Sequence, residues 1–148
     1  MNDDELMAGI RAAFQTLAPV PASVLSAARA SFAWRAPSAR LAELEHDRGG
    51  HPAGVRGGPA RVLTFTCPDA TVEIEVSPDG RLREVHGRLV PSAAALVEVR
   101  HRDLPPGGVT ARTEPAGMFW LPRVPAGLVS LILRLDDGTS IVTSWIRL

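Results

Sequence analysis

Four histidines and a single cysteine are the residues of this 148-residue chain best suited to metal binding or nucleophilic catalysis. A zinc site needs three or four converging ligands, commonly in close pairs such as Cys-x-x-Cys or two histidines four apart on a helix. The sequence has no such pair, and it has no Gly-x-Ser-x-Gly nucleophile elbow. We therefore predict no metal, no cofactor and no catalytic residue, and we expect solvent-facing or partly packed side chains at His46, His51, His86 and His101.

The other residues that could be catalytic are a cysteine and a pair of glutamates, and we expect the first in an apolar environment and the second on an exposed surface. Cys67 alternates with Leu63 and Phe65 in a strand pattern, which places its thiol on the core side, where a cysteine is inert. Glu73 and Glu75 lie two apart on the polar side of the next strand pattern. An exposed sheet face lacks the apolar pocket that separates the pKa values of a general acid and a general base. We predict that the protein is not an enzyme.

Charge and composition restrict the partners. All 16 basic residues are arginines, so a Walker-type phosphate loop and a pyridoxal Schiff base, which need lysine, are excluded. Sixteen acidic residues balance them, and a neutral chain has no cation surplus for nucleic acid or an anionic membrane. Two Arg-Gly-Gly tripeptides, at 48–50 and 56–58, are too few for RNA binding. The acidic start differs from a secretory signal, so we expect a cytoplasmic protein.

Large aromatic side chains are the strongest indications of a binding surface. Phe119 and Leu121 alternate with Trp120 in a short strand pattern, so we expect Trp120 to face outward. An outward tryptophan is covered by another part of the chain, contacts a protein partner or stacks on a sugar ring, and the sequence leaves these three open. The candidate partner-binding residues are Phe14, Phe32, Trp34 and Trp120.

Two short helices are predicted to precede the strands. Residues 3–17 carry an apolar stripe with helical spacing, formed by Leu6, Ile10, Phe14 and Leu17. Pro19 ends this helix, and a second is expected from Pro21 to about Arg35. Short amphipathic helices are not stable alone in water, so their stripes must pack on the rest of the chain or on a partner. The sequence does not decide between the two.

The rest of the chain is predicted to be a loop followed by strands. Residues 38–47 fit a short helix or an edge strand, and we favour the strand. From Arg61 onward apolar residues recur at every second position in eight short segments separated by turn signals. We therefore predict an α+β, mainly β protein with a helical N-terminal segment at 1–48, a Gly/Pro-rich loop at 49–60 and an antiparallel Greek-key β-sandwich at 61–148.

Within the strands, a set of glycine, proline and apolar positions between residues 85 and 135 carries a family resemblance. These positions are Gly87, Leu89, Val97, Val99, 110–113, Gly117, Phe119, Leu121, Val124, Pro125 and Gly127. The segment resembles the carboxypeptidase-regulatory or transthyretin-like sandwich family. That resemblance implies a Greek-key sandwich that serves as a stabilising, anchoring or recognition module without catalytic residues.

A second resemblance covers nearly the whole chain, from residues 19–21 through 32–35 to 143–145. These segments are similar to small actinobacterial proteins encoded beside extracytoplasmic-function sigma factor genes. The gene neighbourhood implies a regulatory protein partner. We therefore predict a non-enzymatic protein-interaction role, with a sigma factor or a neighbouring gene product as partner; the alternative is a small-ligand or carbohydrate-binding β-sandwich.

Overall fold

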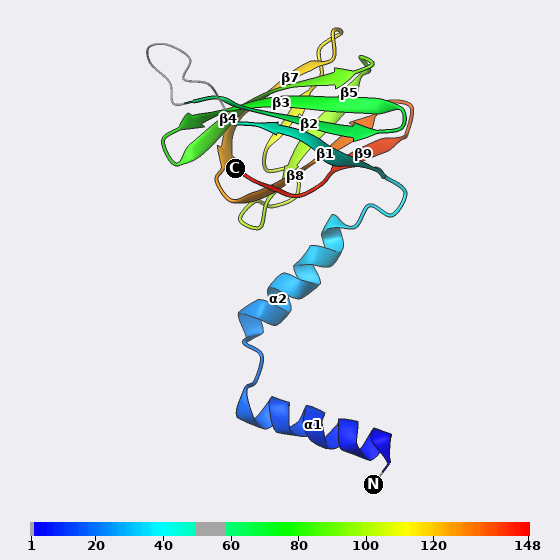
Figure 1. The fold of residues 1–148 in the computed structure, drawn as a ribbon, viewed down its shortest axis with the longest axis vertical. Helices are drawn as coiled ribbons and strands as arrows, with labels where there is room; N and C mark the ends of the chain where they lie inside the picture. Colours follow the sequence, from blue (N-terminus) through cyan, green and yellow to red (C-terminus); the bar gives the residue numbers. More distant parts are fainter. Residues whose placement is uncertain (1, 50–58) are drawn as a thin grey trace. The chain divides into compact units, whose positions relative to one another are not determined.

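A computed structural model describes residues 2–49 and 59–148 of the chain. His51 and most of the predicted loop at 49–60, with its second Arg-Gly-Gly tripeptide, lie outside the described residues. The described residues confirm a mainly β protein with two short helices at the N-terminal end (Figure 1). Its contacts divide it into two units, Met1–Arg35 and Ala36–Leu148, which we call the helical unit and the sheet unit.

The helical unit contains two α-helices and a short 3₁₀ turn. Helix α1, Asp3–Leu17, begins with a capping box: the Asn2 side chain accepts the Glu5 N–H at 2.8 Å, and the Glu5 carboxylate accepts the Asn2 N–H at 3.3 Å. Helix α2 spans Ala22–Ser31 and the 3₁₀ turn η1 spans Phe32–Trp34. The second helix is therefore shorter than predicted, because its last residues wind into the tighter turn.

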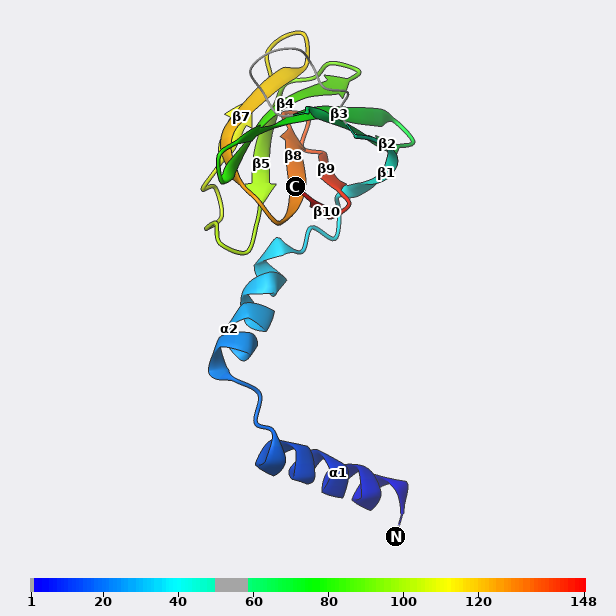
Figure 2. The same ribbon diagram turned by 60° about the vertical axis from the view of Figure 1, so that its left-hand side comes forward.

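The sheet unit is one sheet that is nearly closed (Figures 1 and 2). Its strands follow the order β6-β5-β8-β9-β1-β2-β3-β4-β7, and β10 pairs with β8. The two end strands approach each other where the Glu114 N–H donates to the Met118 carbonyl at 2.7 Å. The strands are β1 (Arg40–Arg48), β2 (Arg61–Cys67), β3 (Ala70–Asp79), β4 (Leu82–Val90), β5 (Ala95–Arg100), β6 (Thr110–Arg112), β7 (Met118–Pro125), β8 (Leu128–Leu135), β9 (Ser140–Thr143) and β10 (Ile146–Arg147).

Strand β1 joins the two halves of this sheet. Residues 40–42 pair with β9 in parallel, and residues 43–48 pair with β2 in antiparallel fashion across a bulge. The strand interpretation of residues 38–47 is confirmed, while the parallel pair departs from the expected antiparallel arrangement. Because Ala42 is fully buried between its neighbours, β1 belongs to the sheet unit and not to the helical segment 1–48 predicted from the sequence.

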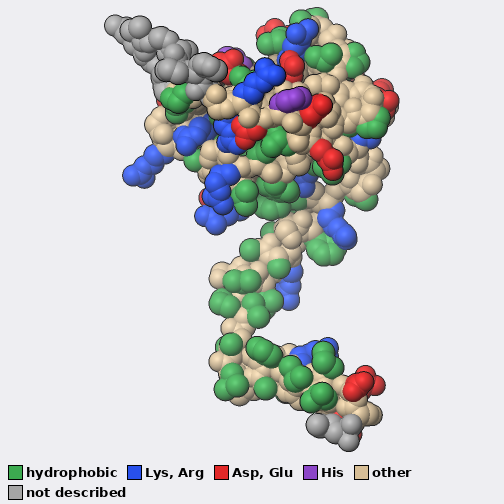
Figure 3. Space-filling model, in the orientation of Figure 1, with side chains coloured by type: hydrophobic (Ala, Val, Ile, Leu, Met, Phe, Trp, Pro, Cys, Tyr) green, Lys and Arg blue, Asp and Glu red, His purple; other side chains and the backbone are tan. Residues whose placement is uncertain are grey.

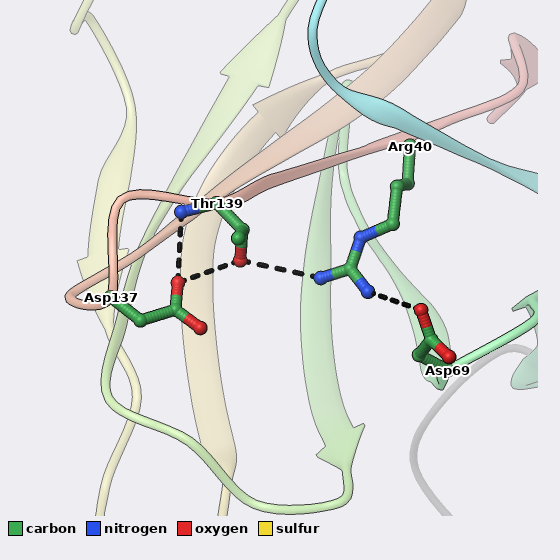
Figure 4. A network of polar contacts seen from close by, with 4 residues as sticks. All are labelled: Arg40, Asp69, Asp137 and Thr139. Carbon is green, nitrogen blue, oxygen red and sulfur yellow. Dashed lines mark hydrogen bonds and ion pairs between the residues drawn. The ribbon is translucent and has the colours of Figure 1, made fainter.

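The start of β1 is held by a polar network that spans two turns (Figure 4). The Arg40 guanidinium donates to the Asp69 carboxylate at 2.7 Å and to the Thr139 hydroxyl at 3.3 Å. Thr139 in turn donates from its hydroxyl and its N–H to Asp137, at 2.7 and 2.8 Å, and these bonds hold the pKa of the Asp137 carboxyl below its usual value. The network fixes the β2–β3 and β8–β9 turns where β1 enters the sheet.

The core lies between the two halves of the curved sheet and is filled by the inward side chains of alternating positions. Phe119 and Leu121 are buried while Trp120 is exposed, so the predicted facing of β7 is confirmed. Gly87 lies against the Phe119 ring, since a Cβ there would lie 2.0 Å from a ring carbon. Cys67 packs against the core as predicted but is only half-buried, because β2 ends at this residue.

Candidate functional site

Two surfaces of the protein could bind a partner or a ligand, and the first is on the helical unit. Neither helix nor the 3₁₀ turn contains a buried residue. Phe14 and Phe32 are each 68% exposed and Leu17 is 83% exposed, values far above those of packed side chains. We call this set the helical apolar surface (Figure 3); its members are Leu6, Ile10, Phe14, Leu17, Val24, Leu25 and Phe32.

Local contacts within the helical unit shape this surface. A hollow of about 520 Å³ lies at the junction of α1 and α2 and is lined by Phe14, Val20 and Leu25. The Arg35 guanidinium lies 4.7 Å from the centre of the Phe32 ring, which is a cation–π contact. Trp34, in contrast, is half-buried. The predicted residues Phe14 and Phe32 are thus the exposed aromatic groups of this unit.

The second surface is the outward side of β1, β2, β3, β4 and β7, which we call the outer sheet face. Strand pairing sets two charged residues opposite each other, Glu73 against Arg88, and sets Glu75 opposite His86. These residues line a hollow of about 510 Å³. Figure 3 shows charged side chains of both signs beside a histidine on the side of the sheet unit turned to the viewer. The floor of this hollow therefore mixes hydrogen-bond donors and acceptors.

Trp120 lies at the edge of the outer sheet face and belongs to a three-residue cluster. Its indole N–H donates to Glu84 Oε1 at 2.8 Å, and His86 Nε2 lies 3.2 Å from the same oxygen. The His86 and Trp120 rings are tilted by 19°, with their centroids 6.2 Å apart. One carboxylate thus orients two nearly parallel rings. Sequence reasoning found Trp120 but missed Glu84 and His86, because only the strand register shows that His86 lies opposite Trp120.

The third tryptophan, Trp145, lies in a different environment. The Arg100 guanidinium is 5.5 Å from its ring centre, and burial lowers the pKa of Arg100. Near it, Arg134 on β8 forms an ion pair with Glu98 on β5, and Glu98 also accepts the Gly107 N–H at 2.9 Å. These contacts tie a loop and two strands together, so we assign this cluster to stability.

His101 is buried and structural. Its Nδ1 accepts the Asp103 N–H at 3.0 Å, so Nε2 carries the ring proton and donates to the Ala126 carbonyl at 3.0 Å. This imidazole fastens the β7–β8 turn, where Gly127 has a φ of 121° that a side chain would strain. His101 is more buried than the sequence predicts, because residue types alone do not show that the β7–β8 turn lies over the ring.

Among the described residues, no group of three His, Cys, Asp or Glu side chains is arranged to hold a metal ion. No helix of the described ranges is long and apolar enough to cross a membrane.

The candidate residues fall on both units. Phe14, Phe32 and Trp34 lie in the helical unit, and Trp120 lies in the sheet unit. One candidate surface is therefore described within each unit. Comparisons of the chain with protein-family models, curated proteins and solved structures gave no match.

Proposed function

We propose that this chain is a non-enzymatic interaction protein whose helical unit binds a protein partner through the helical apolar surface. The observation that carries this proposal is the exposure of that entire surface. Apolar side chains recur along α1 with helical spacing, and neither α1 nor α2 buries any of its residues. The sheet unit, in contrast, has a complete core of its own.

The physical argument concerns the stability of the helices. The capping box favours the start of α1, but helices of 15 and 10 residues are marginal in water without tertiary packing. Burying a large apolar side chain stabilises by about 1.5–3 kcal/mol. The seven side chains are 42–83% exposed, so covering them supplies a gross stabilisation on the order of 6–12 kcal/mol, comparable to the cost of association of about 4–15 kcal/mol.

The pattern of anchors matches helix-in-groove recognition. Leu6, Ile10, Phe14 and Leu17 follow one another at spacings of four, four and three. The partner would present an apolar groove. Following the resemblance to actinobacterial proteins encoded beside sigma factor genes, we propose a sigma factor or a neighbouring gene product as this partner, in the cytoplasm. The transthyretin-like sandwich class remains our proposal for the sheet unit, which would serve as the scaffold.

The test begins with capture of the partner by the full chain from the native host, followed by titration calorimetry of the purified pair. Phe14→Glu places a charge in the middle of the helical apolar surface and should weaken binding at least tenfold, about 1.4 kcal/mol. Ala8→Glu is the matched control, because Ala8 lies on the opposite side of α1 and is also exposed. Equal affinity of the two variants would overturn the proposal.

A further inference from the structure

The outer sheet face carries features that partner binding by the helical unit leaves unexplained. Trp120 is 54% exposed, although a tryptophan is among the most favourable side chains to bury. Its only polar atom is already used by Glu84, at 2.8 Å. A ligand that contacts Trp120 therefore meets its apolar ring and not its N–H group.

The ring is also held in place before any ligand arrives. Glu84 Oε1 lies within hydrogen-bond distance of both the Trp120 and the His86 ring nitrogens. Both rings stand on neighbouring strands of the sheet, directly opposite each other. Orientation by a shared carboxylate and by rigid strands lowers the entropy that binding would otherwise cost.

The hollow beside this cluster offers both donors and acceptors. Within the described part of the chain, the side chains of Glu73, Glu75 and Arg88 form no ion pair or hydrogen bond with one another or with other residues. Thr64 adds a hydroxyl in the same row as Glu73 and Arg88. The volume of about 510 Å³ lies within the range of small-molecule sites, roughly 300–1,000 Å³.

The chemistry of this floor restricts the ligand. A nucleic acid or another anion would meet the carboxylates of Glu45, Glu73 and Glu75, and a cation would meet the guanidinium groups of Arg48 and Arg88. A neutral ligand with many hydroxyl groups satisfies donors and acceptors together, and the C–H face of its ring can cover an indole.

We infer that the outer sheet face is a carbohydrate-binding site, in which a neutral saccharide stacks on Trp120 and extends its hydroxyl groups over the hollow toward Glu73, Glu75 and Arg88. Glu84 is a positioning residue that acts through the two rings. The observations behind this inference all lie in the sheet unit, so it can fail or hold whatever the outcome for the helical apolar surface.

The experiment is affinity electrophoresis of the full chain in native gels that contain soluble starch, hydroxyethylcellulose, xylan, glucomannan or glycol chitin. We expect at least one of these polysaccharides to retard the protein. Trp120→Ala should reduce the affinity for that polysaccharide about tenfold. Glu84→Ala keeps both rings and should weaken binding by a smaller factor. Trp145→Ala is the matched control, since it removes an exposed tryptophan elsewhere in the sheet unit and should leave retardation unchanged.

Thermal unfolding of each variant, followed by circular dichroism, checks that the fold is retained. Three results would overturn the inference: no retardation in any of the five gels, equal retardation of wild type and Trp120→Ala, or equal loss in Trp145→Ala. A protein partner whose affinity depends on Trp120 in calorimetry would also overturn it, because the face would then be a protein interface.

Discussion

The helical unit and the sheet unit use the same kinds of apolar residue in opposite ways. In the sheet unit, Phe65, Phe119 and Leu121 lie within the core and are 0–3% exposed. In the helical unit, Phe14 and Phe32 are each 68% exposed. Since both units have ordinary amphipathic patterns, the difference shows that a regular pattern predicts which side of an element is apolar but not what covers it.

The largest expected effect is the loss of folding when a truncation extends from the helical unit into β1. Deleting residues 1–35 should leave the sheet unit folded, because its core and all of its strands lie after Arg35. Deleting residues 1–48 also removes β1, which pairs with both β9 and β2, and should abolish cooperative folding. Thermal melts followed by circular dichroism distinguish the two truncations. A cooperative melt of the 49–148 fragment would contradict the account, because it would show that the sheet unit folds without β1.

A second contrast lies within β7. Phe119→Ala should destabilise the sheet unit by about 3–5 kcal/mol, the usual loss for a buried aromatic side chain. Trp120→Ala should cost clearly less, about 1 kcal/mol, since it removes one hydrogen bond and a half-exposed ring. Urea unfolding of both variants measures the difference, and similar losses would contradict the assignment of inward and outward positions in this strand.

The buried imidazole gives an intermediate effect. His101→Leu would leave the Asp103 N–H and the Ala126 carbonyl without the ring that bonds both. Asp103 and Ala126 are themselves exposed, so the loss comes from two hydrogen bonds worth about 0.5–1.5 kcal/mol each, and we expect about 2 kcal/mol in urea unfolding. His101→Gln can restore one of the two bonds and should lose less. A Leu variant as stable as wild type would mean that this turn does not depend on the ring.

The smallest effect depends on pH. The Arg61 side chain donates to Asp47 at 2.9 and 2.6 Å and holds the pKa of that carboxyl below 3.8, its usual value. A lowered pKa in the folded state stabilises the fold above the unfolded value, and this contribution is lost as the pH falls through the folded value. The Asp47 side chain is 38% exposed, so we expect the ion pair to contribute at most about 1 kcal/mol to the free energy of unfolding. Asp47→Asn should lose this amount at pH 7 and match wild type near pH 2 in urea unfolding; an equal deficit at both pH values would contradict the account.

Local periodicity was sufficient to predict much of the sheet unit. The alternation of apolar and polar residues located most strands and gave the correct facing of Phe119, Leu121 and Trp120. It could not show that β1 runs parallel to β9, because that pairing joins residues about 100 positions apart. Nor could it show that the chain leaves β9 after Thr143 and pairs again with β8 as β10.

The candidate sites show the same limit. Single residues such as Phe14 and Trp120 could be chosen by type and position, since each is a large aromatic group on a regular element. The cluster around Trp120 depends on Glu84 and His86, which the sequence presents as ordinary polar residues of a strand. Only the register of β4 against β7 brings them to one ring, so a cross-strand site of this kind is not visible in the sequence alone.

The most direct test of the contrast between the two units is hydrogen–deuterium exchange of the free full chain at low concentration, followed by mass spectrometry. Amides of α1 and α2 should exchange close to the rate of an unstructured chain, because their apolar side is not packed. Amides of β2, β3, β4 and β8 should be protected by the sheet core. Adding the captured partner should then protect α1. Helices protected as strongly as these strands in the free chain would contradict the account, since their apolar surface would already be covered.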